Sequence, residues 1–481
     1  MLVRSQPLRL KIFKTNEESK MSLFDAMNAS AKTTNGAAAY HSTTSGCLDF
    51  FFQAGASRGK NINHYFLAAM AENKEYALRT LLWLRDREGA GERQQFKDLM
   101  QEVIKSEKAS VVSAVIQKIP TLGRFDDLFI FFGTKYEAEA VDIIVAALRE
   151  GNGLAAKWMP RKGPIFKAVS VAMGFTSAKP FRKVLVGLTN VVESKMCAGE
   201  WDEIDFSKLP SLASARYQKA FNTNAEAKYQ IYKDALESGE TTINAGAVYP
   251  YDIIKSLNKG DQVVANAQWQ ALPDYMNGND ERILPIVDVS GSMCCAAGGS
   301  NSISCMDIAI SLGMYISERS MGVFKDQFIT FSENPKMHKL SGTLYQRYNL
   351  ARRADWGMST NLERVFDLVL QQATQFNVPE EQMPTKIMIL SDMQFNYCIE
   401  NPQATLNQAM KDKYVRAGYK IPQVVFWNLN SSDNVPVTMN EYGVALVSGF
   451  SPSLLTALLG DKDFTPTSVM LDVIMKDRYK L

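Results

Sequence analysis

The stretch Ile283-Leu-Pro-Ile-Val-Asp288-Val-Ser290-Gly-Ser292-Met293 decides which fold we expect for the C-terminal half of this 481-residue chain. A short run of apolar, β-type residues ends at Asp288, and Ser290 and Ser292 follow at alternating positions. Binding sites of open parallel α/β sheets gather beyond the carboxyl ends of the strands, and Mg²⁺ prefers a few hard oxygen ligands. The stretch therefore predicts a strand that ends at a divalent-cation site, although Asp, Ser and Gly also build ordinary turns.

Two further segments extend this pattern. The segment Gly357-Met-Ser-Thr360-Asn-Leu362 opens an amphipathic stretch, and Ile387-Met-Ile-Leu-Ser391-Asp392 is another apolar run that ends in an acidic residue. Together with Asp288-x-Ser290-x-Ser292, these segments resemble the metal-ion-dependent adhesion site (MIDAS) of von Willebrand factor A domains. The C-terminal half is therefore expected to be an A-like domain.

The resemblance implies a role for each residue of the metal site. Ser290 and Ser292 would bind the cation directly, Thr360 directly or through water, and Asp288 and Asp392 mostly through bound water. In A domains, an acidic group of a partner fills the open coordination position. The resemblance thus implies Mg²⁺, or another divalent cation, that serves as a ligand-dependent clamp and not as a catalyst.

Strand-like and helix-like segments alternate after residue 280. Such alternation predicts an α/β doubly wound parallel sheet whose crossovers are right-handed. The strands are expected at 283–288, 327–332, 385–391, 422–427 and 443–448, and the helices at 305–319, 361–376, 402–417 and 452–459. A polar turn at Asn277-Gly278-Asn279-Asp280 places the start of this domain, residues 281–481, near residue 280.

The first 280 residues show helical periodicity almost throughout. In 136–149, for example, Val141, Ile144, Val145 and Leu148 repeat the spacing of an amphipathic helix. Helices are expected at 62–72, 74–86, 92–107, 109–118, 125–133, 136–149, 180–196, 211–221 and 225–237. Tandem helices of this size predict an α-helical repeat module, a HEAT-like solenoid or ring, over residues 34–280, although a compact helical bundle fits the same pattern. Residues 1–33 are expected to be a mobile N-terminal arm.

Five strings in the helical half resemble landmarks of proteins related to the TROVE module (telomerase-associated protein, Ro, vault). They are Asn35-Gly36-Ala37, Leu48-Asp49-Phe50-Phe51, Arg85-Asp86-Arg87-Glu88-Gly89-Ala90-Gly91-Glu92-Arg93, Gly123-Arg124-Phe125-Asp126-Asp127-Leu128 and Lys157-Trp158-Met159-Pro160-Arg161. A helical module followed by an A domain is the order found in Ro-like proteins and in an uncharacterised TROVE-like family. In Ro-like proteins, a ring of helices passes single-stranded RNA ends through a positive hole and binds structured small RNA outside. The resemblance therefore implies non-catalytic RNA binding.

Basic and aromatic side chains are concentrated in residues 151–200. Eight Lys and Arg stand against two Glu there, a local net charge of +6. Cations meet phosphates and aromatic rings stack on bases, so this composition suits single-stranded nucleic acid. The candidate RNA-binding residues are Lys157, Trp158, Arg161, Lys162, Lys167, Arg182 and Lys183. The alternative is that the lysines form a solvated helix face and the aromatic residues belong to the core.

Composition and cysteine usage are those of a soluble globular protein. Hydrophobic residues make up 46% and charged residues 22% of the chain, and the formal net charge is +2. No apolar run reaches the roughly 20 residues of a membrane span, and the N-terminus shows no secretory h-region. Six cysteines without a Cys-x-x-Cys pair, with three histidines, do not form the pattern of a structural zinc site. We therefore expect a cytoplasmic protein with reduced thiols and no membrane association.

No catalytic set emerges from the sequence. Gly55-Ala-Ser-Arg-Gly-Lys60-Asn61 is one residue short of a phosphate-binding loop and has Asn where Ser or Thr would hold Mg²⁺. No Ser-His-Asp or Cys-His set can be assembled, so we expect no enzymatic activity. The expected function is a non-catalytic RNA-binding scaffold of Ro/TROVE type whose A domain binds an acidic group of a protein partner through Mg²⁺. The alternatives are a metal-dependent protein-interaction or assembly scaffold without RNA binding and, third, an enzyme of unrecognised type.

Overall fold

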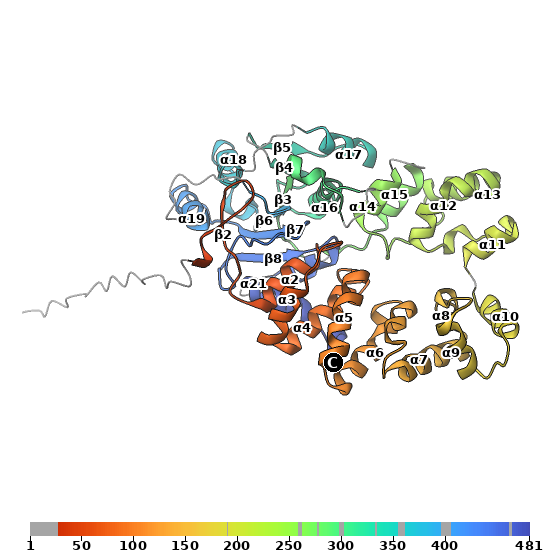
Figure 1. Cartoon of the computed structure of the whole chain (residues 1–481). Helices are drawn as coiled ribbons and strands as arrows, with labels where there is room; N and C mark the ends of the chain where they lie inside the picture. Colours follow the sequence, from red (N-terminus) through yellow and green to blue (C-terminus); the bar gives the residue numbers. More distant parts are fainter. Residues whose placement is uncertain are drawn as a thin grey trace, which may run out of the picture.

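A six-stranded sheet organises the C-terminal half of the computed structural model, which describes residues 27–189, 191–257, 262–276, 279–297, 303–331, 334–354, 361–395, 406–460 and 464–481 (Figure 1). The strands are β3 (Ile283–Asp288), β4 (Gln327–Phe331), β5 (Lys336–Lys339), β6 (Lys386–Ser391), β7 (Gln423–Asn428) and β8 (Val444–Ser448), in the order β5-β4-β3-β6-β7-β8. Among the described strands of this sheet, β4 and β5 pair antiparallel and the other neighbours pair parallel. The five predicted strands are confirmed. The sheet is nevertheless mixed and not purely parallel, because β5 runs antiparallel at its edge. The sequence did not predict β5, because this strand is polar and shows no apolar run.

Burial explains why the central strands could be predicted. Every residue of β3 and β6 is buried, as expected for strands of a parallel sheet that are covered on both faces. The helices of this half are α16 (Cys305–Arg319), α17 (Leu344–Arg352), α18 (Leu362–Gln375), α19 (Leu406–Arg416), α20 (Leu455–Leu458) and α21 (Pro466–Ile474). Helix α16 packs against β3, β4 and β6, so it covers the centre of the sheet.

The N-terminal half is helical, as predicted. Its helices are α2 (Gly46–Ala54), α3 (Asn63–Glu72), α4 (Lys74–Arg85), α5 (Arg93–Ser106), α6 (Ala109–Leu122), α7 (Glu137–Arg149), α8 (Gly153–Trp158), α9 (Pro164–Ala172), α10 (Ala178–Leu188), α11 (Val192–Ala198), α12 (Ser211–Asn224), α13 (Glu226–Glu237), α14 (Pro250–Leu257) and α15 (Gln262–Gln270).

Two predicted helices are wrong. The range 180–196 contains two helices, α10 and α11, because Gly187 and Thr189 are poor helix formers and the Thr189 hydroxyl bonds back to the Leu185 carbonyl at 2.6 Å. The range 125–133 contains the 3-10 helix η1 (Phe125–Phe131). There, the buried Asp127 side chain accepts from the Arg124 N–H at 2.9 Å and so tightens the turn.

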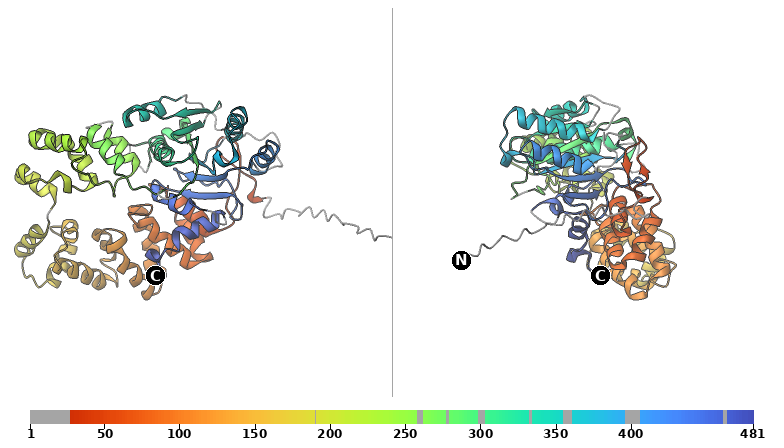
Figure 2. Two further views of the ribbon diagram at one scale, coloured as in Figure 1. Left: turned by 180° about the vertical axis from the view of Figure 1, so that it is seen from behind. Right: turned by 90° about the vertical axis from the view of Figure 1, so that its left-hand side faces the viewer.

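The chain of helices starts and ends on the sheet domain. Helix α2 packs against β8 and α4 against α21, while α14 packs against α16. Figures 1 and 2 show the intervening helices as an arc whose two ends lie against the sheet domain. One continuous hydrophobic cluster contains side chains from α2 to α10, from α14 and from the sheet, whereas Phe206, Phe221 and Tyr229 centre a smaller cluster within the arc. The two halves therefore share a core.

The N-terminal residues 27–43 also lie on the sheet domain. Strands β1 (Ala31–Lys32) and β2 (Ala38–Ala39) pair antiparallel across a turn in which Gly36 has φ +88°, a conformation that favours glycine. Tyr40 exchanges two backbone hydrogen bonds, of 2.9 and 3.0 Å, with Val435. Residues 27–33, which fall within the predicted arm, are thus part of the packed structure.

The loop after α4 holds the C-terminal residues of the chain. The fully buried Asp86 carboxylate accepts from the Arg478 guanidinium at 2.5 and 2.9 Å and from the Tyr479 hydroxyl at 2.9 Å. A few residues further on, Glu92 pairs with Arg58, whose guanidinium lies over the Phe450 ring. The charged string Arg85–Arg93 therefore includes ion pairs that join the helices to the sheet domain.

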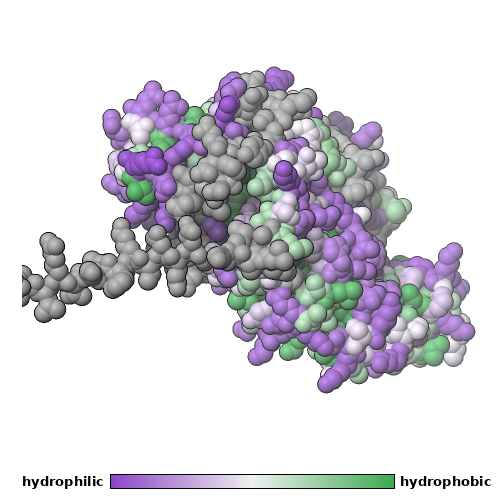
Figure 3. Space-filling view, turned by 60° about the vertical axis from the view of Figure 1, so that its left-hand side comes forward, coloured by the Kyte–Doolittle hydropathy of each residue, from purple (hydrophilic) through white to green (hydrophobic). Residues whose placement is uncertain are grey.

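The face of the molecule seen in Figure 3 is largely polar. Figure 3 shows one side of the molecule, on which polar residues prevail and apolar residues form separate small patches. In the described ranges, no helix combines the length and the apolar character that crossing a bilayer requires.

Candidate metal centre

The acidic residues of the predicted metal site lie where the order of the strands reverses. Strand β3 ends at Asp288 and β6 at Ser391, and these parallel neighbours pair with Val287 opposite Leu390. The next strand along the chain, β4, lies on one side of β3, whereas β6, followed by β7, lies on its other side. Ligands of open α/β sheets bind at such a topological switch point, outside the carboxyl ends of the strands.

The register of β3 and β6 brings carboxylates and hydroxyls together. Ser391 Oγ donates to Asp288 Oδ2 at 2.5 Å, and the Ser290 N–H donates to Asp288 Oδ1 at 2.9 Å. The Oγ atoms of Ser290 and Ser292 lie 3.0 Å apart, and the Ser292 hydroxyl also bonds to Asp392. The structure therefore collects Asp288, Ser290, Ser292 and Asp392, four of the five predicted residues, into one oxygen cluster.

Burial makes this cluster receptive to a cation. Burial, and after it the charge of Asp392, raises the pKa of Asp288 to about 6. Burial likewise raises the pKa of Asp392, although a hydrogen bond from Ser292 opposes the shift. Two buried carboxylates close together are costly to ionise unless a positive charge compensates them. A donor set of carboxylates and hydroxyls suits Mg²⁺ or another hard divalent cation, so the residues present fit the group that the sequence implies.

The fifth predicted residue, Thr360, lies outside the described residues, and its role stays a prediction. The adjacent Asn361 is described, and its side chain caps α18 by accepting from the Arg364 N–H at 3.1 Å. Asn361 therefore marks the N-terminus of α18.

The hairpin formed by β1 and β2 donates hydrogen bonds to the loop after Asp392. The Thr33 hydroxyl donates to the Phe395 carbonyl, Asn35 Nδ2 donates to the Gln394 carbonyl at 2.7 Å, and the Thr34 N–H donates to Gln394 Oε1 at 2.8 Å. These contacts join residues about 360 positions apart in the chain, so no local pattern could predict them.

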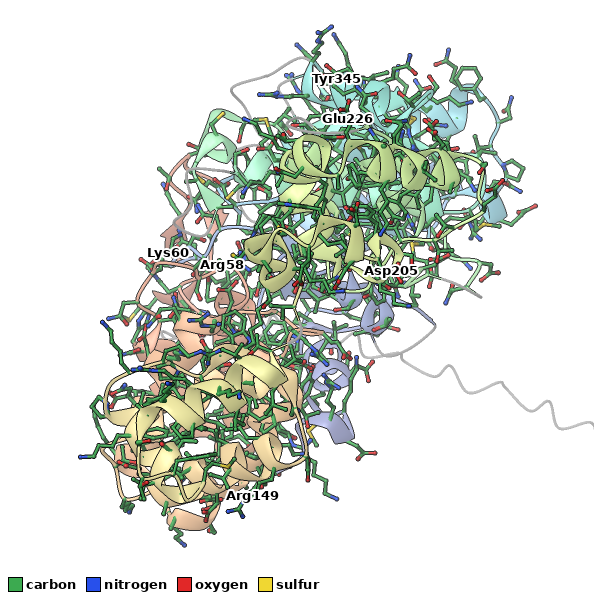
Figure 4. The ribbon with its side chains drawn as sticks, turned by 90° about the vertical axis from the view of Figure 1, so that its right-hand side faces the viewer. Arg58, Lys60, Arg149, Asp205, Glu226 and Tyr345 are labelled. Atoms are coloured by element: carbon green, nitrogen blue, oxygen red, sulfur yellow. The ribbon has the colours of Figure 1, made fainter. Side chains whose placement is uncertain are left out.

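Lys60 adds a positive charge from the helical half. Its Nζ donates to Asn430 Oδ1 at 2.6 Å and to the Ser431 carbonyl, in the loop after β7. Burial lowers the pKa of Lys60, whereas nearby acidic groups, Asp392 among them, oppose that shift. Figure 4 shows Lys60 beside Arg58, where the N-terminal helices meet the rest of the molecule. The string Gly55–Asn61, considered above as a phosphate-binding loop, thus joins the two halves.

The candidate RNA-binding residues lie on α8, α9 and α10 and in the loop after α8. Lys162, Lys167, Arg182 and Lys183 are exposed. Arg161 instead caps α8, since its guanidinium donates to the carbonyls of Ala156 and Met159 at 3.0 and 2.9 Å.

The other members of this set are engaged in contacts within the protein. Lys157 lies 3.6 Å from Glu193, and Trp158 is half-buried beneath Arg124, whose guanidinium is 3.3 Å from the ring centroid. The rings of Phe166 and Phe181 pack on each other in the core. The segment therefore presents cations to solvent more than aromatic rings.

Comparisons with known proteins place the chain among uncharacterised relatives. Residues 282–478 and 167–280 match two family models, both described as a domain of unknown function (DUF7788 and DUF2828). The solved structure of the RO (RSR) protein of Deinococcus radiodurans is 13% identical and aligns over 90% of this chain and 100% of that one, with a TM-score of 0.45. The uncharacterized protein L728 of Acanthamoeba polyphaga mimivirus is 30% identical over an alignment 507 positions long, gaps included, which covers 92% of this chain and 86% of that protein. With that identity over nearly the whole length, the chain belongs to the same family as L728.

Proposed function

We propose that this protein is a non-catalytic scaffold whose sheet domain holds Mg²⁺, or another divalent cation, and through it binds an acidic group of a protein partner. The observation that carries this proposal is the oxygen cluster at the switch point of the sheet, in which Asp288, Ser290 and Asp392 are buried and Ser292 is exposed. Thr360 would complete the protein ligands. Mg²⁺ sites with few protein ligands keep positions filled by water, and one of these is open to a partner carboxylate.

Metal titration of the full chain tests this proposal directly. Protein stripped with EDTA and dialysed should bind MgCl₂ at one saturable site in calorimetry. It should also unfold at a higher temperature as the MgCl₂ concentration rises, because a ligand that binds only the folded state stabilises it by mass action. A chain that shows neither heat nor thermal shift with Mg²⁺ or Mn²⁺ at millimolar concentration would refute the metal site.

RNA binding is a second candidate function, favoured by the exposed cations of α10. Lys179, Arg182 and Lys183 are exposed and lie three and four residues apart, so they share one helix face. Arg182 Nε also donates to the Arg161 carbonyl at 2.9 Å, which brings this face close to the loop that carries Lys162. A row of this kind attracts the phosphates of a single strand.

Reversing three of these charges should weaken RNA binding in a salt-dependent way. We expect the triple change Lys162→Glu, Lys179→Glu and Lys183→Glu to lower affinity for a fluorescein-labelled single-stranded RNA by about tenfold or more at low salt. The plot of log K against log salt should become shallower, its negative slope decreasing in magnitude by about 2, because each lost phosphate contact removes roughly 0.7. Fluorescence anisotropy over a salt series measures both.

A matched variant separates a local effect from a change in total charge. Lys105→Glu, Lys108→Glu and Lys135→Glu alter the net charge equally at exposed positions elsewhere in the helical half. This variant should keep the affinity and slope of the wild type. If both triple variants bind alike, α10 is not the RNA surface, and if the wild type binds no RNA, the scaffold acts without it.

A further inference from the structure

Two thiols face each other beyond the metal cluster, Cys295 in the loop after Ser292 and Cys305 in the first turn of α16. Cys295 Sγ and Cys305 Sγ lie 3.4 Å apart. The Cys305 N–H donates to the Cys295 carbonyl at 3.1 Å, and Ala296 and Ser304 form an antiparallel bridge, so the backbone holds the two segments side by side. Since sulfurs in a disulfide are about 2.05 Å apart, they would have to approach by only about 1.4 Å.

The two thiols differ in access. Cys295 is half-buried, whereas Cys305 is 1% exposed and begins α16. The two sulfur atoms are in hydrogen-bond contact, so the buried thiol lies directly behind the more accessible one. An accessible thiol in front of a buried second thiol is the arrangement that lets a mixed disulfide resolve into an intramolecular disulfide.

We propose that Cys295 and Cys305 form a reversible redox modification site that exchanges with low-molecular-weight disulfides of the glutathione class. The Cys295 thiolate attacks one sulfur of oxidised glutathione, the S–S bond breaks, and one glutathione leaves as a thiolate. Cys305 gives its proton to solvent and attacks the Cys295 sulfur of the mixed disulfide, which expels the second glutathione. Two protein thiols are oxidised to one disulfide, and one glutathione disulfide is reduced to two thiols.

The cross-link would act on the loop that carries the candidate metal ligands. Cys295 comes three residues after Ser292, and Cys305 is fixed in the first turn of α16. A bond between them ties the end of the loop to a helix that packs on β3. The redox chemistry needs no metal, so it stands independently of the proposed metal site.

Mass spectrometry of the full chain tests the proposal. Reduced protein, freed of small thiols, is exposed to oxidised glutathione, quenched in acid, alkylated and digested with trypsin. Cys294, Cys295 and Cys305 lie on one tryptic peptide, 283–319, because no Lys or Arg occurs between Arg282 and Arg319. After oxidation this peptide should carry a single alkyl group, on Cys294, and after dithiothreitol it should carry three.

Neighbouring cysteines supply the controls. Cys294 is exposed in the same loop, so Cys294→Ser should keep the cross-link and carry no alkyl group after oxidation. Cys305→Ser should lose the cross-link and accumulate a glutathione adduct at Cys295. If that buried change prevents folding, Cys295→Ser, at the half-buried position, should likewise abolish the cross-link with unchanged circular dichroism. A cross-link that uses Cys294, or a wild-type chain that stays reduced or keeps the adduct, would overturn the proposal.

Discussion

Replacing Asp288 with Ala should lower the affinity of the sheet domain for Mg²⁺ by about 100-fold or more. Loss of a residue that merely orients a metal ligand typically costs about 10- to 100-fold, and Asp288 supplies one of only two carboxylates in the cluster. Its carboxylate also accepts from the Ser290 N–H and from Ser391, so removing it frees the loop that positions the serine hydroxyls. Calorimetric titration of the EDTA-stripped variant with MgCl₂ measures the loss.

Asp288→Asn separates metal binding from folding. The amide keeps an acceptor for the Ser290 N–H but removes one of two neighbouring buried charges. The metal-free Asn variant should therefore unfold at the same temperature as the metal-free wild type, or higher. Its unfolding temperature should not rise when MgCl₂ is added. Glu381→Gln, an exposed change near the amino-terminal end of β6, removes a carboxylate of the same domain and should bind Mg²⁺ like the wild type. Full Mg²⁺ affinity in Asp288→Ala would disprove the metal centre.

The sequence could place Asp288 and Asp392 together because Asp288 ends one buried strand and Asp392 directly follows another. Continuous apolar runs such as Ile283–Val287 and Ile387–Leu390 identify strands of a parallel sheet, and the carboxyl ends of parallel neighbours meet at one edge. The resemblance to A domains added the expectation that these two strands are neighbours in the sheet. The polar edge strand β5 and the break between α10 and α11 were not predictable in this way, because neither depends on an apolar pattern.

What surrounds the cluster depends on contacts distant in sequence. Lys60 reaches Asn430 from 370 residues away, and Asn35 reaches the Gln394 carbonyl from 359. Cys295 and Cys305, only 10 residues apart, could be paired only after the register of their short bridge was known. Periodicity and motif spacing describe single elements, whereas these contacts follow from how the helical half docks on the sheet.

That docking depends on a close approach of α2 to β8. Gly55 follows α2, and its N–H donates to Ser448 Oγ at 3.0 Å, while the Ser448 hydroxyl donates to the Phe51 carbonyl at 2.9 Å. A Cβ atom on Gly55 would lie 2.4 Å from the Ser448 carbonyl oxygen, which belongs to the backbone of β8. The strand and the helix would have to separate, and both hydrogen bonds would lengthen.

We therefore expect Gly55→Ala to destabilise the whole protein by about 3 kcal/mol, the upper part of the range for overpacked interiors. The backbone at Gly55 is ordinary right-handed helix, so the cost comes from space and not from conformation. Gly187→Ala, in α10, is the matched control: its Cβ would meet nothing within 4 Å, and it should stabilise the helix by about 0.5–1 kcal/mol. Urea unfolding followed by tryptophan fluorescence measures both, because Trp83 and Trp427 are buried in the helical half and in the sheet. Since the two halves share one core, the transition should move as a unit, and an unchanged midpoint in Gly55→Ala would refute the tight contact between α2 and β8.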